Sequence, residues 1–153
     1  MENQNEKKTE ELENLLKNAA ALKDYTRLKK EFPGTTSLSG YLGEYLTRKG
    51  FDKAEVIRNS QLADNYAYAI FNGNKSHPAR DRIIALCLAM HMSLEDAQRA
   101  LKISNAGILY ARNQRDALIM LAFNTGSYDV MKLNEFLLEN GLGILETSRQ
   151  SGS

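Results

Sequence analysis

Cysteine, proline and tryptophan are almost absent from this sequence of 153 residues, which has one, two and none of them. Because Cys87 is the single cysteine, no disulfide can form within the chain, and the reducing cytoplasm is the expected location. Cys87 lies in the apolar run IIALCLAM, and no histidine pairs with it by spacing. We therefore expect a packed core thiol rather than a nucleophile.

Motifs of catalysis, metal binding and membrane insertion are also missing. No apolar run approaches the ~18 residues of a membrane span, and the opening MENQNEKKTEE is unlike a signal peptide. His77 and His91 stand without a Cys, His or carboxylate at ligand spacing, and no phosphate-binding glycine loop or nucleophile–base pattern occurs. We expect a protein that is not an enzyme and binds neither metal nor cofactor.

What the chain does have is helical spacing of apolar residues, without the alternation that indicates strands. We therefore expect an all-α protein. Residues 1–34 are predicted to form an amphipathic helix and a linker, and residues 147–153 a disordered tail. The stripe of the first helix either packs on the domain or forms a dimer seam; it comprises Leu12, Leu15, Leu16, Ala19 and Leu22.

Five helices are predicted between residues 37 and 104, with recognisable ends. Gly50 is the expected C-cap of the first, Asp52 with Glu55 the capping box of the second, and Ser93 the N-cap of the fifth. The stretch VIRNSQLADNYAYAIFNG places two short helices on either side of a tight turn. The first runs from Lys53 to Asn59, and the second from Asp64 to Phe71.

Residues 79–109 and 114–145 resemble each other as two copies of one helix pair. Each copy opens with Arg-Asp at a helix start, and we expect a structural role for both aspartates. The copies predict that residues 105–146 form a C-terminal helical pair that extends the core. Two motifs recur at offsets of 35 and 36 residues: Arg80-Asp81 as Arg115-Asp116, and Gly107-Ile108-Leu109 as Gly143-Ile144-Leu145.

The register from Lys53 to Gly73 resembles the helix-turn-helix of phage-repressor-like (XRE, lambda-repressor-like) regulators of bacteria and phages. Further along, Pro78 before a helix and the run LAMHMSLEDAQRAL match the same family. The resemblance covers about residues 39–104 and implies a lambda-repressor-like five-helix domain at 37–104. Its apolar positions and closing glycine are matched by Val56, Ile57, Leu62, Ile70 and Gly73.

The chain departs from the family in the turn. Gln61 replaces the turn glycine, and Ala63 replaces the capping Ser or Thr. The second change removes a helix cap worth ~1 kcal/mol. Tyr66, Ile70 and Phe71 are expected in the core, because the second helix must dock its inner face.

The resemblance implies a DNA-binding transcriptional regulator that acts as a homodimer on double-stranded DNA, with its second helix in the major groove. The residues that would face bases are Asp64, Asn65, Tyr68 and Ala69. The residues that would face phosphates are Lys53, Asn72, Lys75, His77 and Arg80.

An alternative is a non-enzymatic interaction module with the same helix-turn-helix scaffold. It would bind a protein partner through the acidic and aromatic helix at residues 64–71 and the C-terminal helices. The absence of Arg and Lys from residues 64–71 favours this alternative. The net charge of +1 does not point to nucleic acid, although residues 39–91 carry seven Lys/Arg against five Asp/Glu. The cations around the second helix favour DNA.

Overall fold

The computed structural model describes residues 37–147, which lie in the second of the two units into which the chain divides, residues 36–153. This part of the chain contains seven α-helices and no strand, so the all-α prediction is confirmed there. The predicted N-terminal helix at 1–34 and most of the predicted tail lie outside the described residues. The first residue assigned to that tail, Thr147, is described and is buried.

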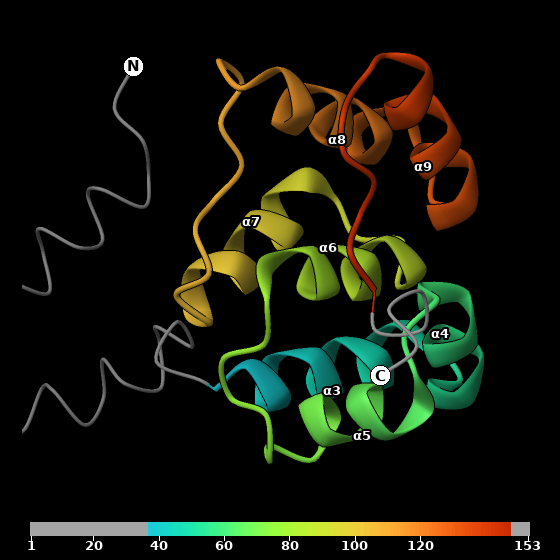
Figure 1. The fold of residues 1–153 in the computed structure, drawn as a ribbon. Helices are drawn as coiled ribbons and strands as arrows, with labels where there is room; N and C mark the ends of the chain where they lie inside the picture. The colour runs from blue at the N-terminus through green and yellow to red at the C-terminus, as the bar shows by residue number, and fades with distance from the viewer. Residues whose placement is uncertain (1–36, 148–153) are drawn as a thin grey trace, which may run out of the picture. The chain divides into compact units, whose positions relative to one another are not determined.

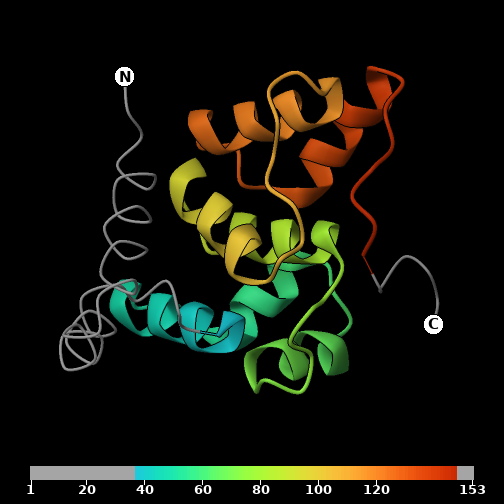
Figure 2. The same ribbon diagram turned by 90° about the vertical axis from the view of Figure 1, so that its left-hand side faces the viewer.

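The helices form three layers, best seen in Figures 1 and 2. The first layer holds α3 (Leu38–Lys49), α4 (Lys53–Ser60) and α5 (Asp64–Phe71); the second holds α6 (Arg80–Ala89) and α7 (Leu94–Ile103). The third holds α8 (Gln114–Thr125) and α9 (Val130–Glu139). In Figure 1 these layers run from the blue-green helices at the bottom to the orange-red helices at the top.

The middle layer explains why α6 is apolar on all sides. On one side α4 packs on α6 and α3 on α7, while on the other α9 contacts α6 and α8 contacts α7. Every residue from Ile83 to Met90 is consequently buried, as expected for a helix enclosed on both faces. Cys87 is fully buried in this run, which confirms its predicted place in the core. None of the helices in residues 37–147 has the length and apolarity needed to span a bilayer.

Most predicted helix ends are observed. Gly50 ends α3 in the left-handed conformation, with φ 72°, and the Ser93 hydroxyl accepts the Asp96 N–H at 3.1 Å to cap α7. Asp52 occupies the N-cap position of α4, but its side chain makes no capping hydrogen bond, so the predicted capping box is wrong in that contact. The bounds of α5 are those predicted.

The turn between α4 and α5 has three residues and is anchored from inside. The Ser60 hydroxyl donates to the Ile57 carbonyl at 2.6 Å and accepts the Leu62 N–H at 3.2 Å. Leu62 is fully buried beneath the turn. Gln61 adopts φ 66°, the left-handed backbone for which glycine is best suited, so the turn keeps its conformation despite the replaced glycine.

Matching arginines hold the loop that follows each helix pair. Arg80 donates from Nε to the Gly107 carbonyl and from Nη2 to the Ile108 carbonyl, both at 3.1 Å. Arg115 makes the same two bonds to Gly143 and Ile144, both at 2.8 Å. The sequence repeat is therefore also a repeat of hydrogen bonds.

Two reciprocal ion pairs join the two helix pairs. Arg80 Nη2 lies 2.6 Å from Asp116 Oδ2, and Arg115 Nη2 lies 2.9 Å from Asp81 Oδ2. Each aspartate accepts one backbone N–H as well, from Tyr110 on Asp116 and from Glu146 on Asp81, both at 3.0 Å. The structural role predicted for the two aspartates is confirmed, and it consists of these ion pairs and N–H contacts.

Candidate nucleic-acid interface

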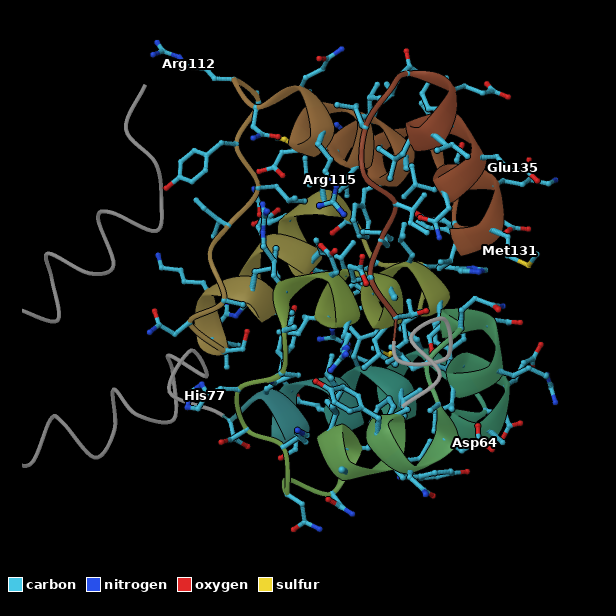
Figure 3. All side chains as sticks on the ribbon, viewed as in Figure 1. Asp64, His77, Arg112, Arg115, Met131 and Glu135 are labelled. Atoms are coloured by element: carbon cyan, nitrogen blue, oxygen red, sulfur yellow. The ribbon has the colours of Figure 1, made fainter. Side chains whose placement is uncertain are left out.

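Helix α5 has one face in the core and one at the surface. Ala67 and Ile70 are fully buried, and Phe71 is nearly so, while Tyr66 is half-buried at the edge of the core. The predicted core positions Ile70 and Phe71 are therefore confirmed, and Tyr66 only in part. The four residues expected to face bases lie on the outer side: Asp64, Asn65 and Tyr68 are exposed and Ala69 is half-buried. Asp64 is labelled at the edge of this layer in Figure 3.

Cationic side chains flank α5 and lie over its aromatic rings. Lys53 Nζ stands 5.4 Å from the ring centre of Phe71, and Lys75 Nζ stands 4.9 Å from that of Tyr66. Such contacts hold a side chain near one position at an energy of about 0.5–1 kcal/mol when exposed. Two of the predicted phosphate-facing residues thus lie beside α5, Lys53 at the Phe71 ring and Lys75 at the Tyr66 ring.

A third cation at α5 was not predicted. The Arg82 guanidinium lies 4.3 Å from the ring centre of Tyr66, the ring that Lys75 also contacts. Its Nε atom is buried and has no hydrogen-bond partner among the described residues. The signal in the sequence was its position two residues after Arg80 on the same helix, which turns it toward a different neighbour.

His77 and Arg80 point elsewhere. The Nδ1 atom of His77 donates to the Ser104 carbonyl at 2.9 Å, and Arg80 is held by the loop after α7 and by Asp116. Both side chains therefore contact the connection between α7 and α8 rather than the flank of α5. The predicted phosphate-facing residues are therefore divided: Lys53, Asn72 and Lys75 lie beside α5. His77 and Arg80 lie at the α7–α8 connection.

The loop after α5 is ordered by its own polar groups. Asn72 Oδ1 accepts the Asn74 N–H at 2.9 Å, and the Lys75 N–H donates to the Ala69 carbonyl at 2.9 Å. Gly73 has φ 88°, and a Cβ there would lie 3.3 Å from Ser39 Oγ of α3. These contacts hold Asn72 and Lys75 beside the end of α5.

The local charge around α5 is small. The cations of Lys53, Lys75 and Arg82 are opposed by the exposed carboxylates of Glu55 and Asp64. No group of three or more His, Cys, Asp or Glu side chains suited to a metal ion occurs within residues 37–147. Burial raises the pKa of the Cys87 thiol, so this group stays protonated inside α6.

Comparison with known proteins gives a single weak similarity to report. The chain is 29% identical over 128 residues to a diaminopimelate epimerase of Buchnera aphidicola subsp. Baizongia pistaciae, covering 81% of this chain and 43% of that protein. The chain thus spans less than half the length of this curated relative. No family model matches the chain. No solved structure matches it either. These results assign no family.

Proposed function

We propose that residues 37–104 form a lambda-repressor-like helix-turn-helix domain and that the protein is a DNA-binding transcriptional regulator of the cytoplasm. The observation that carries the proposal is the position of α5. Its inner face is docked in the core, its outer face is exposed, and Lys53 and Lys75 contact the Phe71 and Tyr66 rings of the same helix. A helix presented in this way has the form needed to enter the major groove.

Each outer residue of α5 has a role that its chemistry allows. The Asn65 amide matches the two hydrogen-bonding groups of adenine, and Tyr68, 43% exposed, has a ring for a thymine methyl and a hydroxyl for a phosphate. The half-buried Ala69 offers a methyl contact, while Asp64 can only accept, as from the amino group of cytosine.

The phosphate contacts come from beside the helix. Lys53, Asn72 and Lys75 are exposed next to α5, and we assign them to the DNA backbone, with Arg82 supporting the Tyr66 ring from inside. His77 and Arg80 are omitted, because both are engaged by the loop after α7. A set this small implies modest non-specific affinity and a shallow salt dependence for one copy of the chain.

The test is fluorescence anisotropy with fragments of random genomic DNA at two salt concentrations. Binding should weaken with salt and should fall by at least about tenfold in the double variant Lys53→Glu/Lys75→Glu. Arg112→Glu is the matched control, since Arg112 is an exposed cation in the α7–α8 connection, away from Asp64 in Figure 3. Absence of binding at low salt would overturn the proposal.

A protein partner on α5 is the second candidate. It is favoured by the composition of the helix, which exposes a carboxylate and an aromatic ring and carries no Arg or Lys. In that case the DNA titration gives no signal, and substitution of Tyr68 abolishes binding to the protein partner instead. Both functions would use the outer face of α5. Measuring DNA binding and partner binding with the same Lys53, Lys75 and Tyr68 variants distinguishes them.

A further inference from the structure

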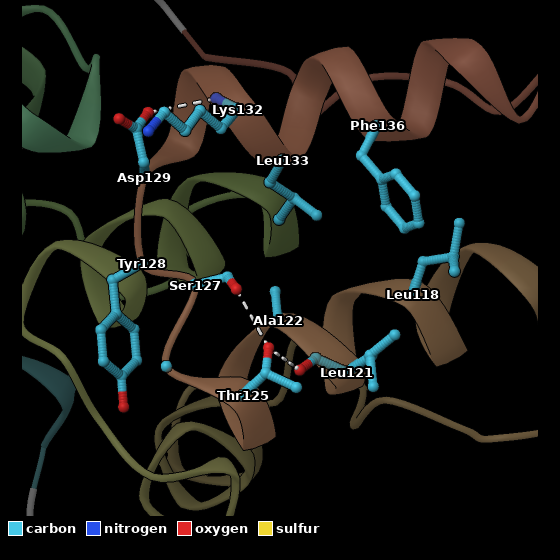
Figure 4. A pocket seen from close by; sticks show the side chains of 11 residues that line it. Leu118, Leu121, Ala122, Thr125, Ser127, Tyr128, Asp129, Lys132, Leu133 and Phe136 are labelled. Atoms are coloured by element: carbon cyan, nitrogen blue, oxygen red, sulfur yellow. Dashed lines mark hydrogen bonds between the residues drawn. The ribbon is translucent and has the colours of Figure 1, made fainter.

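A groove of about 530 Å³ opens between α8 and α9 (Figure 4). Leu118 and Leu121 of α8 form one wall, and Leu133 and Phe136 of α9 form the other. Leu121 and Phe136 remain 49% and 42% exposed, which is unusual for large apolar side chains that face each other across a groove. Exposed apolar side chains grouped beside a groove form a candidate binding surface.

The first helix pair shows what covers such a face. At the same repeat offsets, Leu121 corresponds to Leu86 and Phe136 to Ala100, and both counterparts are fully buried. Two helices of the first layer pack on this pair, α4 on α6 and α3 on α7, and the Tyr41 hydroxyl of α3 donates to the Asp96 carbonyl of α7 at 3.0 Å. Burial raises the pKa of Tyr41, and the nearby Asp96 and Cys87 add to that rise.

The second pair has no such covering helix within residues 37–147. A repeat unit of this size buries its apolar face only against a neighbouring element. We propose that a second copy of the chain supplies that element, so that the α8–α9 grooves of two copies face each other across a twofold axis. A face with both a groove and projecting apolar side chains is self-complementary, as a twofold interface requires.

The charges on α9 fit an antiparallel partner. Lys132 and Glu139 are exposed and seven residues apart, which is close to two helical turns, so both lie on the flank of α9 that carries Phe136. An antiparallel α9 centred near Phe136 brings Lys132 of each copy to Glu139 of the other. A parallel arrangement would instead place like charges together. This dimer surface needs no DNA, so it stands or falls separately from the proposed function.

The test is sedimentation velocity of the full chain without DNA, from about 1 to about 100 μM. The wild type should show a monomer–dimer equilibrium, which Leu121→Ser and Phe136→Ser should each weaken by about tenfold or more. Leu138→Ser is the matched control, because Leu138 is on α9 and 69% exposed but does not line the groove. This variant should dimerise like the wild type.

A charge exchange tests the antiparallel arrangement. Lys132→Glu and Glu139→Lys should each weaken the dimer about tenfold, and the double variant should restore it. Neither substitution should harm α9, because acids suit a helix N-terminus and bases its C-terminus. A wild type that is monomeric at every concentration overturns the proposal. So does a dimer unaffected by Phe136→Ser, which would place the seam elsewhere, for example on the stripe from Leu12 to Leu22.

Discussion

The Arg80 guanidinium lies 2.6 Å from the Asp116 carboxylate, and Arg115 stands in the same relation to Asp81, so each arginine binds the aspartate of the other repeat. Each arginine also holds two carbonyls of the loop that follows its own helix pair. One guanidinium therefore fixes both a loop and a neighbouring helix start. Substitutions of Arg80 and Asp116 separate these two contributions.

Replacing Arg80 by Ala should lower the free energy of unfolding by roughly 2–3 kcal/mol, because Asp116 is only 4% exposed and would lose its cation. Urea denaturation measures the change, with the exposed Arg112→Ala as control. The swapped variant Arg80→Asp/Asp116→Arg should stay destabilised, since the carbonyls of Gly107 and Ile108 then lack their donor. Full recovery in the swap would mean that the ion pair alone matters.

The turn before α5 should gain stability from glycine. Gln61 has φ 66°, so Gln61→Gly should raise the free energy of unfolding by about 0.5–1 kcal/mol through relief of left-handed backbone strain. Asn59→Gly, two residues earlier in the last turn of α4, should have the opposite sign, because glycine has a lower helix propensity than asparagine. Thermal or urea unfolding of both variants gives the comparison. A loss of stability in Gln61→Gly would contradict the account of the turn.

Glycine to alanine should have opposite effects at two sites. Gly73→Ala should cost about 1–2 kcal/mol, because φ is 88° and the new Cβ would lie 3.3 Å from Ser39 Oγ. Gly43→Ala should stabilise by about 0.5–1 kcal/mol, because Gly43 lies within α3 and a Cβ there meets nothing within 4 Å. Differential scanning calorimetry should show the two melting temperatures moving apart, and a shared direction would refute the prediction.

Stability should fall in alkaline solution. Burial, with a contribution from the Asp96 carboxylate, raises the pKa of Tyr41 above its usual 10.0, so the folded chain holds this proton more tightly than the unfolded chain. The stabilisation is present below pH 10 and is lost as pH rises further, at up to about 1.4 kcal/mol per pH unit. Tyr41→Phe should flatten the decline between pH 10 and 11. An unchanged slope would show that Tyr41 ionises equally in both states.

Local sequence signals predicted the helices well and the roles of their charges poorly. The bounds of α5 were predicted because Asn72-Gly73 ends the helix and the turn precedes it within a few residues. Arg80 was expected to face phosphate, because the helix-turn-helix resemblance places it near the helix that follows α5. Its partner Asp116 is 36 residues away, and only the packing of α6 against the third layer brings the two together.

The spacing of apolar residues also did not predict which apolar side chains of α8 and α9 are exposed. Leu121 lies in the continuous apolar run LIMLAF and Phe136 is followed by Leu137-Leu138, so spacing does not distinguish these exposed residues from buried Ile119 and Leu137. The burial of each depends on the layers: α8–α9 contacts the middle layer on one face, whereas α6–α7 has neighbours on both faces. Arg82 was missed for a similar reason, because its contact with Tyr66 joins helices from different layers.

The reciprocal arginine–aspartate contacts also determine how the protein comes apart. Because the Glu146 N–H is bonded to Asp81, the end of the described chain is tied back to the start of α6. The last helix pair therefore cannot fray from its terminus without uncovering the carboxylate at the start of the middle layer. We therefore expect α8–α9 and α6 to open in one cooperative event, with amide hydrogens in both pairs exchanging with solvent together rather than in order along the chain.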